Sequence, residues 1–134
     1  MGWFVRRIVE NKEIQLYGDG SQIRDLNFVD DVVDALLLAA VSTKADGQIF
    51  NLGGKERITL KQLVELMIEI NRGGSYRLVP FPADQKRIDI GSFYAEYSKI
   101  SGTLGWEPRI GLRDGLERTI AFYKRNLEHY VVNN

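Results

Sequence analysis

The spacing of hydrophobic residues along the chain predicts a series of short helices and strands. Trp3, Phe4, Ile8 and Val9 fall at helical spacing, which predicts a first helix over roughly residues 2–11. Apolar and polar residues alternate in EIQLYG, residues 13–18, as expected of a short strand that breaks at the following glycines. A second short strand is predicted in RDLNFV, residues 24–29.

The next helix is predicted to begin at Asp30 or Asp31 and to end near Val41. Either aspartate could cap it, because a carboxylate oxygen can accept from the free N–H groups of the first turn. From Val32 to Val41 the only charged residue is Asp34, so this helix is apolar nearly all round. Such a helix needs cover on every side. In so small a domain, that cover could come from another chain or from a domain that this sequence lacks.

From residue 47 onward, the hydrophobic pattern predicts further strands and helices. GQIFNLGG, residues 47–54, is predicted as a strand, and YRLVPFP, residues 76–82, as a strand that prolines stop. Thr59 and Gln62 predict a capping box at the start of a helix. Residues 89–100 lead into a short helical turn. The final helix is predicted to bury a stripe of Leu112, Leu116, Ile120, Tyr123 and Leu127.

The predicted order α, β, β, α, β, α, β, α, α indicates a small mixed α/β fold, and residues 1–134 are expected to form a single domain. With 44% hydrophobic residues in 134, the chain can build one core. The 18 basic and 18 acidic residues cancel, so no overall field attracts nucleic acid or an anionic membrane. Neither a membrane span nor a signal peptide is visible, and the cytoplasm is the expected location. The chain has no cysteine and one histidine, His129, which argues against a metal site.

The segment LYGDGSQIRD, residues 16–25, is the first candidate for ligand binding. Its glycines allow backbone conformations that other residues avoid, and Arg24 offers a planar fork that suits phosphate oxygens. Tyr17 could stack on a base. In the alternative interpretation, GDG is a plain hairpin turn, Arg24 pairs with Asp25 or another carboxylate, and Tyr17 merely packs. The local pattern alone favours this alternative, because the full phosphate-loop fingerprint is missing.

Two later positions are further candidates. Lys86 and Arg87 form a second basic point, which could meet Arg24 across a diphosphate if the fold brings them together; otherwise they are a solvated surface pair. Asn51 follows the predicted strand and can donate and accept hydrogen bonds at once, which suits a sugar or a base edge. It could equally cap the turn.

Two patterns of dehydrogenase chemistry are absent from the sequence. Neither Gly-x-Gly-x-x-Gly nor Gly-x-x-Gly-x-x-Gly occurs, so no loop for a nicotinamide cofactor is visible. None of the six tyrosines is followed four residues later by a lysine. We therefore expect this chain to provide no cofactor-binding residue and no catalytic residue.

Four segments, taken in order, resemble the C-terminal half of the extended short-chain dehydrogenase/reductase family, the NAD-dependent nucleotide-sugar epimerases and dehydratases. They are IQLYGDGSQIRDLNFVDDVVDALLLAA, GQIFNLGG, RIDIGSFYAEYSKISGTLGWEP and GLRDGLERTIAFYK. In that family a Rossmann domain holds NAD and the catalytic Tyr-x-x-x-Lys, while the C-terminal part closes over the nucleoside diphosphate sugar. The resemblance implies a fold like this C-terminal lobe, without the Rossmann domain.

By motif position, the resemblance assigns Arg24 and Arg87 to the diphosphate, Tyr17 to packing against the base, and Asn51 to the substrate pocket. Two departures stand out: Gly102 falls where relatives keep a continuous helix, and Asn27 stands where an aromatic or another residue is more usual. The first could loosen the turn around it.

Three hypotheses for function follow. The leading one is a nucleotide-sugar-binding lobe that lacks the cofactor-binding and catalytic domain and is inactive alone. The rival is a non-catalytic binding or assembly protein that keeps the fold and hides its apolar face by self-association. A third is a subunit that works with a catalytic Rossmann subunit in trans. A homo-oligomer is expected, because monomers rarely expose a large apolar face.

Overall fold

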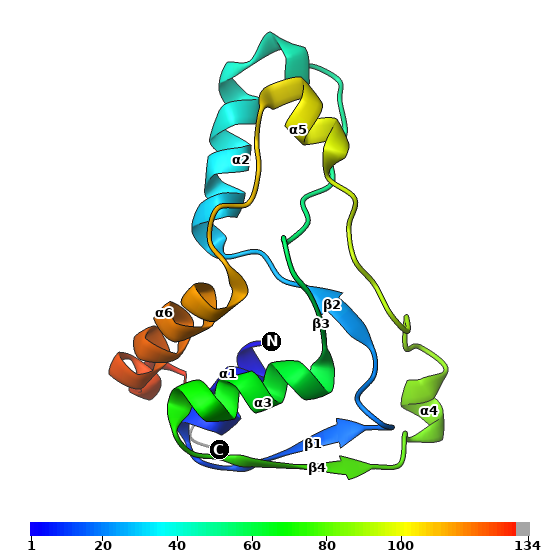
Figure 1. Ribbon diagram of the computed structural model, residues 1–134, viewed down its shortest axis with the longest axis vertical. Helices are drawn as coiled ribbons and strands as arrows, with labels where there is room; N and C mark the ends of the chain where they lie inside the picture. The colour runs from blue at the N-terminus through cyan, green and yellow to red at the C-terminus, as the bar shows by residue number, and fades with distance from the viewer. Residues whose placement is uncertain (131–134) are drawn as a thin grey trace.

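The computed structural model describes residues 1–130 (Figure 1). Its longer elements are α1 (Gly2–Val9), β1 (Glu13–Tyr17), β2 (Ile23–Asp25), α2 (Val29–Val41), β3 (Arg57–Thr59), α3 (Leu60–Asn71), β4 (Ser75–Val79), α5 (Ser98–Leu104) and α6 (Leu112–Arg125). The short elements are η1 (Thr43–Ala45), α4 (Ala83–Lys86) and η2 (Leu127–His129). The predicted class, a small mixed α/β fold, is confirmed.

A two-stranded parallel sheet forms the base of the molecule. β1 and β4 pair from Glu13 opposite Ser75 to Tyr17 opposite Val79, and α1 and α3 lie over this sheet (Figure 1). Exposed and buried residues alternate along β1, so that Ile14 and Leu16 point into the core. The core also takes buried residues from three helices: Val5, Ile8, Leu63, Val64, Met67, Leu116 and Ile120.

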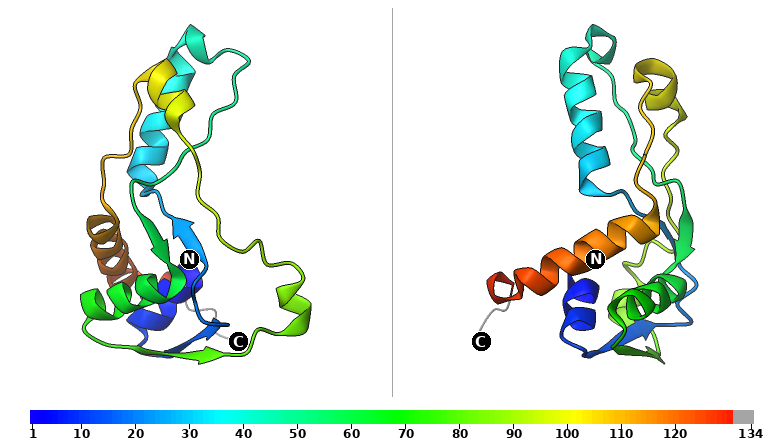
Figure 2. Two further views of the ribbon diagram at one scale, coloured as in Figure 1. Left: turned by 45° about the vertical axis from the view of Figure 1, so that its right-hand side comes forward. Right: turned by 60° about the vertical axis from the view of Figure 1, so that its left-hand side comes forward.

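An arm rises from this base and is built from α2, η1 and α5 (Figure 2). Its own small core contains Ala35, Ile100 and Trp106, with Phe50 and Tyr97 packed against them. Between the arm and the base lies a second two-stranded sheet, in which β2 and β3 run antiparallel with Ile23 opposite Thr59. The arm and the base are therefore joined mainly by extended segments.

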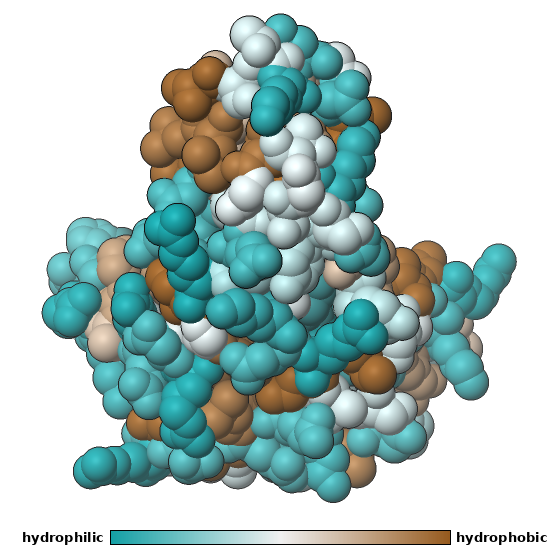
Figure 3. All heavy atoms as spheres, turned by 45° about the horizontal axis from the view of Figure 1, so that its top comes forward, coloured by the Kyte–Doolittle hydropathy of each residue, from teal (hydrophilic) through white to brown (hydrophobic). Residues whose placement is uncertain are grey.

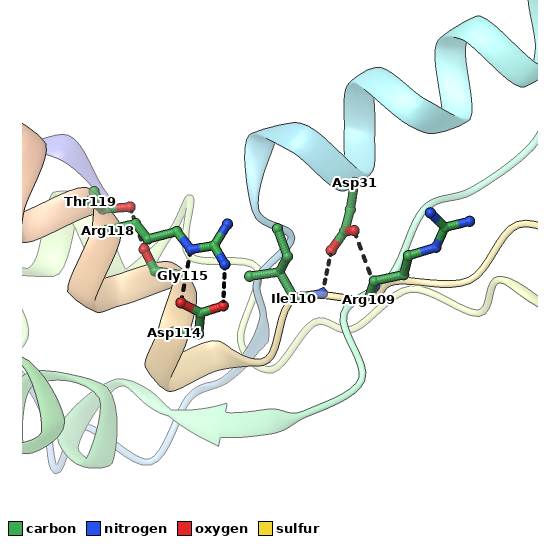
Figure 4. Close-up of polar contacts among 7 residues, drawn as sticks. All are labelled: Asp31, Arg109, Ile110, Asp114, Gly115, Arg118 and Thr119. Carbon is green, nitrogen blue, oxygen red and sulfur yellow. Dashed lines mark hydrogen bonds and ion pairs between the residues drawn. The ribbon is translucent and has the colours of Figure 1, made fainter.

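Asp31 does not cap α2, so the predicted role of this residue is wrong. α2 begins at Val29, and its N-cap residue, Phe28, offers no side-chain oxygen. The Asp31 carboxylate is 2% exposed and accepts from the backbone N–H groups of Arg109, at 3.1 Å, and Ile110, at 3.0 Å (Figure 4). The Trp106 indole N–H donates to the Asp31 carbonyl at 2.9 Å. Asp31 thus fastens α2 to the segment that leads into α6.

The predicted strand over residues 47–54 is also wrong, and β3 lies further along the chain. A strand needs a neighbour that pairs with its N–H and C=O groups. Within residues 1–130, no backbone group of residues 49–53 bonds to another backbone group, and Ile49 is 83% exposed. The apolar pattern is present, but the described part of the chain supplies no strand beside it.

The locally determined features were predicted well. The capping box is confirmed: Gln62 N–H donates to Thr59 Oγ1 at 3.1 Å, and Thr59 N–H donates to Gln62 Oε1 at 3.1 Å. The loosening expected at Gly102 does not occur, because α5 runs from Ser98 to Leu104 without a break. The predicted stripe of the last helix is buried at Leu116 and Ile120, but α6 ends at Arg125, so Leu127 lies in η2 instead. No helix in the described range has both the length and the apolar character needed to cross a bilayer.

Candidate functional site

The loops that follow β1 and β4 meet at one edge of the parallel sheet, because the two strands end side by side. Gly18 N–H donates to the Val79 carbonyl at 2.9 Å, which continues the pairing by one step. Gly18 and Gly20 have φ values of 68° and 71°, a left-handed conformation that glycine adopts without strain. The predicted need for glycine at these two positions is therefore confirmed.

A cavity of about 360 Å³ opens beside this edge. Its wall is largely aromatic, and the ring centroids of Tyr17 and Phe81 lie 5.4 Å apart with their planes tilted by 45°. The full lining consists of Trp3, Phe4, Gln15, Leu16, Tyr17, Gln22, Leu60, Phe81 and Asp89. Aromatic and aliphatic walls with a few polar groups are typical of small-ligand sites, and the volume lies at the lower end of their range.

Arg24 lies beside this cavity, where backbone carbonyls hold its guanidinium. Its Nη1 donates to the carbonyl of Ile23 at 2.7 Å and to that of Gly91 at 2.5 Å. Its Nη2 lies 4.0 Å from Asp89 Oδ1, and the side chain remains 23% exposed. The alternative interpretation, in which Arg24 pairs with a carboxylate, is thus partly met, through Asp89 rather than Asp25.

Asp25 instead joins three segments around the site. Its Oδ2 accepts from Gly54 N–H at 3.2 Å and from Ala95 N–H at 2.9 Å. A side chain at position 54 would not fit, because a Cβ there would lie 2.5 Å from the Leu26 carbonyl oxygen. The absence of a side chain at Gly54 therefore allows close backbone packing against Leu26, the residue that follows β2.

The other two candidate residues lie outside the cavity. Arg87 follows the last residue of α4 and is exposed, two positions before Asp89. Asn51 is exposed on the arm, in the unpaired segment 49–53. Tyr17 therefore lines the cavity, and Arg24 approaches it only through Asp89. The roles of all four residues stay predictions.

Several lining residues were missed from the sequence. Phe81 stands between two prolines after β4, and the rule that parallel strands end at a common edge would have placed it near Tyr17. Trp3 and Phe4 were recognised as part of the first helix, but helical spacing does not say which side of the helix faces a cavity. Gln22 stands inside the glycine loop and carries no signal beyond that position.

The turn after β1 uses its own polar groups. The Asp19 carboxylate accepts from the Ser21 side chain and from the Ser21 backbone N–H, at 2.9 Å for the latter, and these hydrogen bonds lower the pKa of Asp19. An anionic aspartate occupies an N–H group that a phosphate would otherwise use. Any phosphate contact at this edge would therefore fall to Arg24 rather than to the turn.

The turn does not fit NAD. A dinucleotide-binding turn opens a helix, whose N-terminal N–H groups hold the pyrophosphate. Here the Gly18–Gly20 turn leads into β2, a strand. The cofactor that the family uses is therefore not assigned to these residues.

Comparison with known proteins agrees with this picture. A family model described as the NAD dependent epimerase/dehydratase family matches residues 1–53. A dTDP-glucose 4,6-dehydratase from Actinoplanes sp. is 35% identical, over 92% of this chain and 38% of its own length. A UDP-glucuronate 4-epimerase from Thermodesulfobacterium geofontis is 34% identical, over 93% of this chain and 38% of its own length.

A solved structure shares the fold as well. The UDP-glucose 4-epimerase of Thermotoga maritima, determined with UDP-glucose, is 32% identical and superposes with a TM-score of 0.78, over 93% of this chain and 39% of that one. The chain is thus similar to proteins of the NAD dependent epimerase/dehydratase family, and it spans about 38% of the length of the curated relatives it matches.

Proposed function

We propose that the chain is a nucleotide-sugar-binding lobe, and that reaction of the sugar depends on a cofactor-binding part that these 134 residues do not provide. The observation that carries the proposal is the aromatic-walled cavity at the sheet edge, with Arg24 beside it. Relatives named for dTDP-glucose, UDP-glucuronate and UDP-glucose support a nucleoside diphosphate sugar as the ligand.

In this proposal the base enters the cavity and packs against Tyr17 and Phe81, whose rings offer flat apolar surfaces. Arg24 then faces the diphosphate. Its Nη1 is fixed by two carbonyls, so the guanidinium is already oriented, and Nη2 is free to exchange its long contact with Asp89 for a phosphate oxygen. A partly exposed ion pair at 4.0 Å is weak, so this exchange costs little. Arg87 and Asn51 are proposed to contact the diphosphate and the sugar from outside the cavity.

The outer side of α2 is proposed as the contact surface for the cofactor-binding part. Its apolar residues recur at helical spacing and are between 45% and 83% exposed: Val29, Val33, Leu36, Leu37 and Val41. Figure 3 shows apolar side chains gathered on this side of the arm. Residues 49–53 of the same arm make no backbone–backbone hydrogen bond within residues 1–130. Both features fit a sheet supplied by a further domain or by a subunit in trans.

The rival function keeps the fold without any ligand. In a self-associating assembly protein, the same α2 surface would contact a second copy, and the cavity would be incidental. Binding of nucleotides distinguishes the two functions, because the assembly protein has no reason to prefer them or to depend on Arg24.

Arg24→Ala provides the test. Titration calorimetry with UDP, dTDP and UDP-glucose should give weak binding to the wild type, and Arg24→Ala should weaken it by roughly tenfold or more, the factor for a lost charged hydrogen bond. Arg118→Ala is the matched control, since Arg118 pairs with Asp114 on α6, far along the chain from the cavity (Figure 4). Absence of nucleotide binding, or equal binding by wild type and Arg24→Ala, would overturn the proposal. The chain alone, with added NAD, is expected to convert no nucleotide sugar.

A further inference from the structure

The chain contains three Asp–Gly steps, at residues 19–20, 46–47 and 114–115. This dipeptide can rearrange by itself, because glycine has no side chain to shield its nitrogen and leaves the backbone free to turn. The glycine nitrogen forms a bond to Cγ of the aspartate and loses its proton, while the carboxyl group loses its hydroxyl. One water leaves, and a succinimide ring is formed.

Water then reopens the ring at either of its two carbonyl carbons. Attack at Cγ restores the aspartate, whereas attack at the main-chain carbonyl leaves isoaspartate, whose main chain runs through the side-chain carbonyl and is longer by one carbon. Water is released and taken up again, so no other reactant is needed. Ring closure requires a glycine N–H without a hydrogen bond, a backbone that can rotate, and a protonated carboxyl group.

The fold blocks ring closure at Asp114–Gly115. Both residues lie in α6, where Gly115 N–H donates to the Gly111 carbonyl at 3.0 Å. The Asp114 carboxylate accepts two hydrogen bonds from the Arg118 guanidinium, at 2.8 and 2.7 Å (Figure 4). The nitrogen, the backbone and the carboxylate are all held, so a turn of α6 would have to open before the ring could form.

Asp19–Gly20 is held in a different way. The Asp19 carboxylate accepts from the hydroxyl and from the backbone N–H of Ser21, at 2.9 Å for the latter, and these hydrogen bonds lower the pKa of Asp19. The side chain therefore stays anionic to lower pH, and an anionic carboxylate is a poor target for the glycine nitrogen. The Gly20 carbonyl also accepts from Lys61 N–H at 3.0 Å, which fixes the turn.

Asp46–Gly47 has none of these restraints. Both residues are exposed and directly follow η1. Within residues 1–130, the Asp46 carboxylate makes no hydrogen bond or ion pair, and Gly47 N–H donates to no acceptor. Beyond the adjacent residues, no heavy atom lies within 4 Å of the position that a Cβ of Gly47 would take. One backbone bond spans the pair, from Gln48 N–H to the Ala45 carbonyl at 2.9 Å, and its opening frees Asp46 to rotate.

We infer that Asp46–Gly47 is a covalent modification site, at which Asp46 converts to isoaspartate, and that the fold protects the other two Asp–Gly steps. The inference does not depend on the proposed function. The added carbon would lie between η1 and the segment that carries Phe50 and Leu52, both of which pack against the core of the arm. Modification should therefore loosen the packing of this segment against Trp106.

Peptide mapping of the whole chain tests the inference. The protein is kept warm at neutral pH, folded in buffer or unfolded in guanidinium chloride, and isoaspartate at each Asp–Gly step is measured by mass spectrometry after digestion. All three steps should rearrange in the denaturant. In buffer, the rate at Asp46 should stay near its denatured value, while the rates at Asp19 and Asp114 should fall by about tenfold or more, because local unfolding must come first. A rate at Asp46 that falls as far as the other two would overturn the inference.

Asp46→Glu and Asp114→Glu form a matched pair of variants that keep the charge. A glutamate side chain is longer by one carbon and would have to close a larger ring, which forms more slowly. Asp46→Glu should therefore abolish most of the isoaspartate that the folded chain forms, and Asp114→Glu should leave the amount unchanged. Equal amounts in the two variants would contradict the assigned site.

Tryptophan fluorescence reports the effect on the arm. After the same incubation in buffer, the emission of the wild type should shift to longer wavelength as Trp106 becomes hydrated, and the emission of Asp46→Glu should not. If isoaspartate forms at position 46 without this shift, the expected loosening of the arm is wrong and the modification site stands.

Discussion

Asp31 joins the arm to the rest of the molecule through a single buried carboxylate. It accepts two backbone N–H groups from the segment before α6, and its own carbonyl accepts from Trp106. Only a short carboxylate accepts at both oxygens here, because an amide would place an NH₂ donor against one of the two N–H groups. The residue is therefore a sensitive point for the position of α2.

Asp31→Ala should lower the free energy of unfolding by about 2 to 4 kcal/mol, because two partly buried N–H groups would lose their acceptor. Asp34→Ala is the matched control: this neighbouring aspartate is half exposed and lies 3.8 Å from the Arg109 guanidinium. An exposed pair contributes roughly 1 kcal/mol at most. Urea unfolding of both variants decides the question, and equal losses would refute the assigned role of Asp31.

Single residues of the site were partly predictable. Tyr17 and Arg24 were singled out because glycines mark the turn between them, and the turn type is a local property, but their roles stay predictions. Gln22 and Phe81 were missed because their roles depend on which loops meet in space. The predicted cap at Asp31 failed for the same reason, since its real partners lie 78 and 79 positions further along the chain.

At the scale of elements, α3 shows how local signals fix a boundary. Thr59 and Gln62 satisfy each other's backbone N–H groups, and three buried residues then follow on one side of the helix. β3 directly precedes α3, and the first two residues of α3 donate backbone hydrogen bonds to the carbonyls of Gln22 and Gly20. Its cap therefore supports the loop beside the cavity.

Thr59→Ala should destabilise the protein by about 1 kcal/mol through loss of the cap. Thr43→Ala, at the exposed start of η1 where no side-chain cap is formed, should have little effect. Equilibrium unfolding in urea measures both. The same free energy for the two variants would show that the capping box contributes nothing to this fold.

The strands were harder to predict than the helices. The alternation in β1 and the stop at the prolines after β4 gave two strands correctly, because a neighbour for each exists in the chain. The segment 47–54 has an equally good apolar pattern, but no strand among residues 1–130 pairs with it. A pattern predicts that a segment suits a sheet, and pairing decides whether it joins one.

For the whole molecule, the uncovered side of α2 makes a prediction about association. Without a cofactor-binding part, this surface should pair with another copy, so sedimentation should show a concentration-dependent oligomer. The double variant Leu36→Lys with Leu37→Lys should stay monomeric, because two charges would have to be buried in the contact. Leu78→Lys, which changes an exposed leucine of β4, is the control and should associate like the wild type. A wild type that remains monomeric at high concentration would contradict this expectation.

The two tryptophans of the chain lie in different parts of the molecule, one in the arm and one beside the cavity. Trp106 is 3% exposed in the core of the arm, whereas Trp3 is 53% exposed beside the cavity. Buried indoles emit at shorter wavelengths than hydrated ones, so one fluorescence spectrum contains a blue component from the arm and a red component from the ligand site. A nucleotide that enters the cavity would quench the red component, and loosening of the arm would shift the blue one.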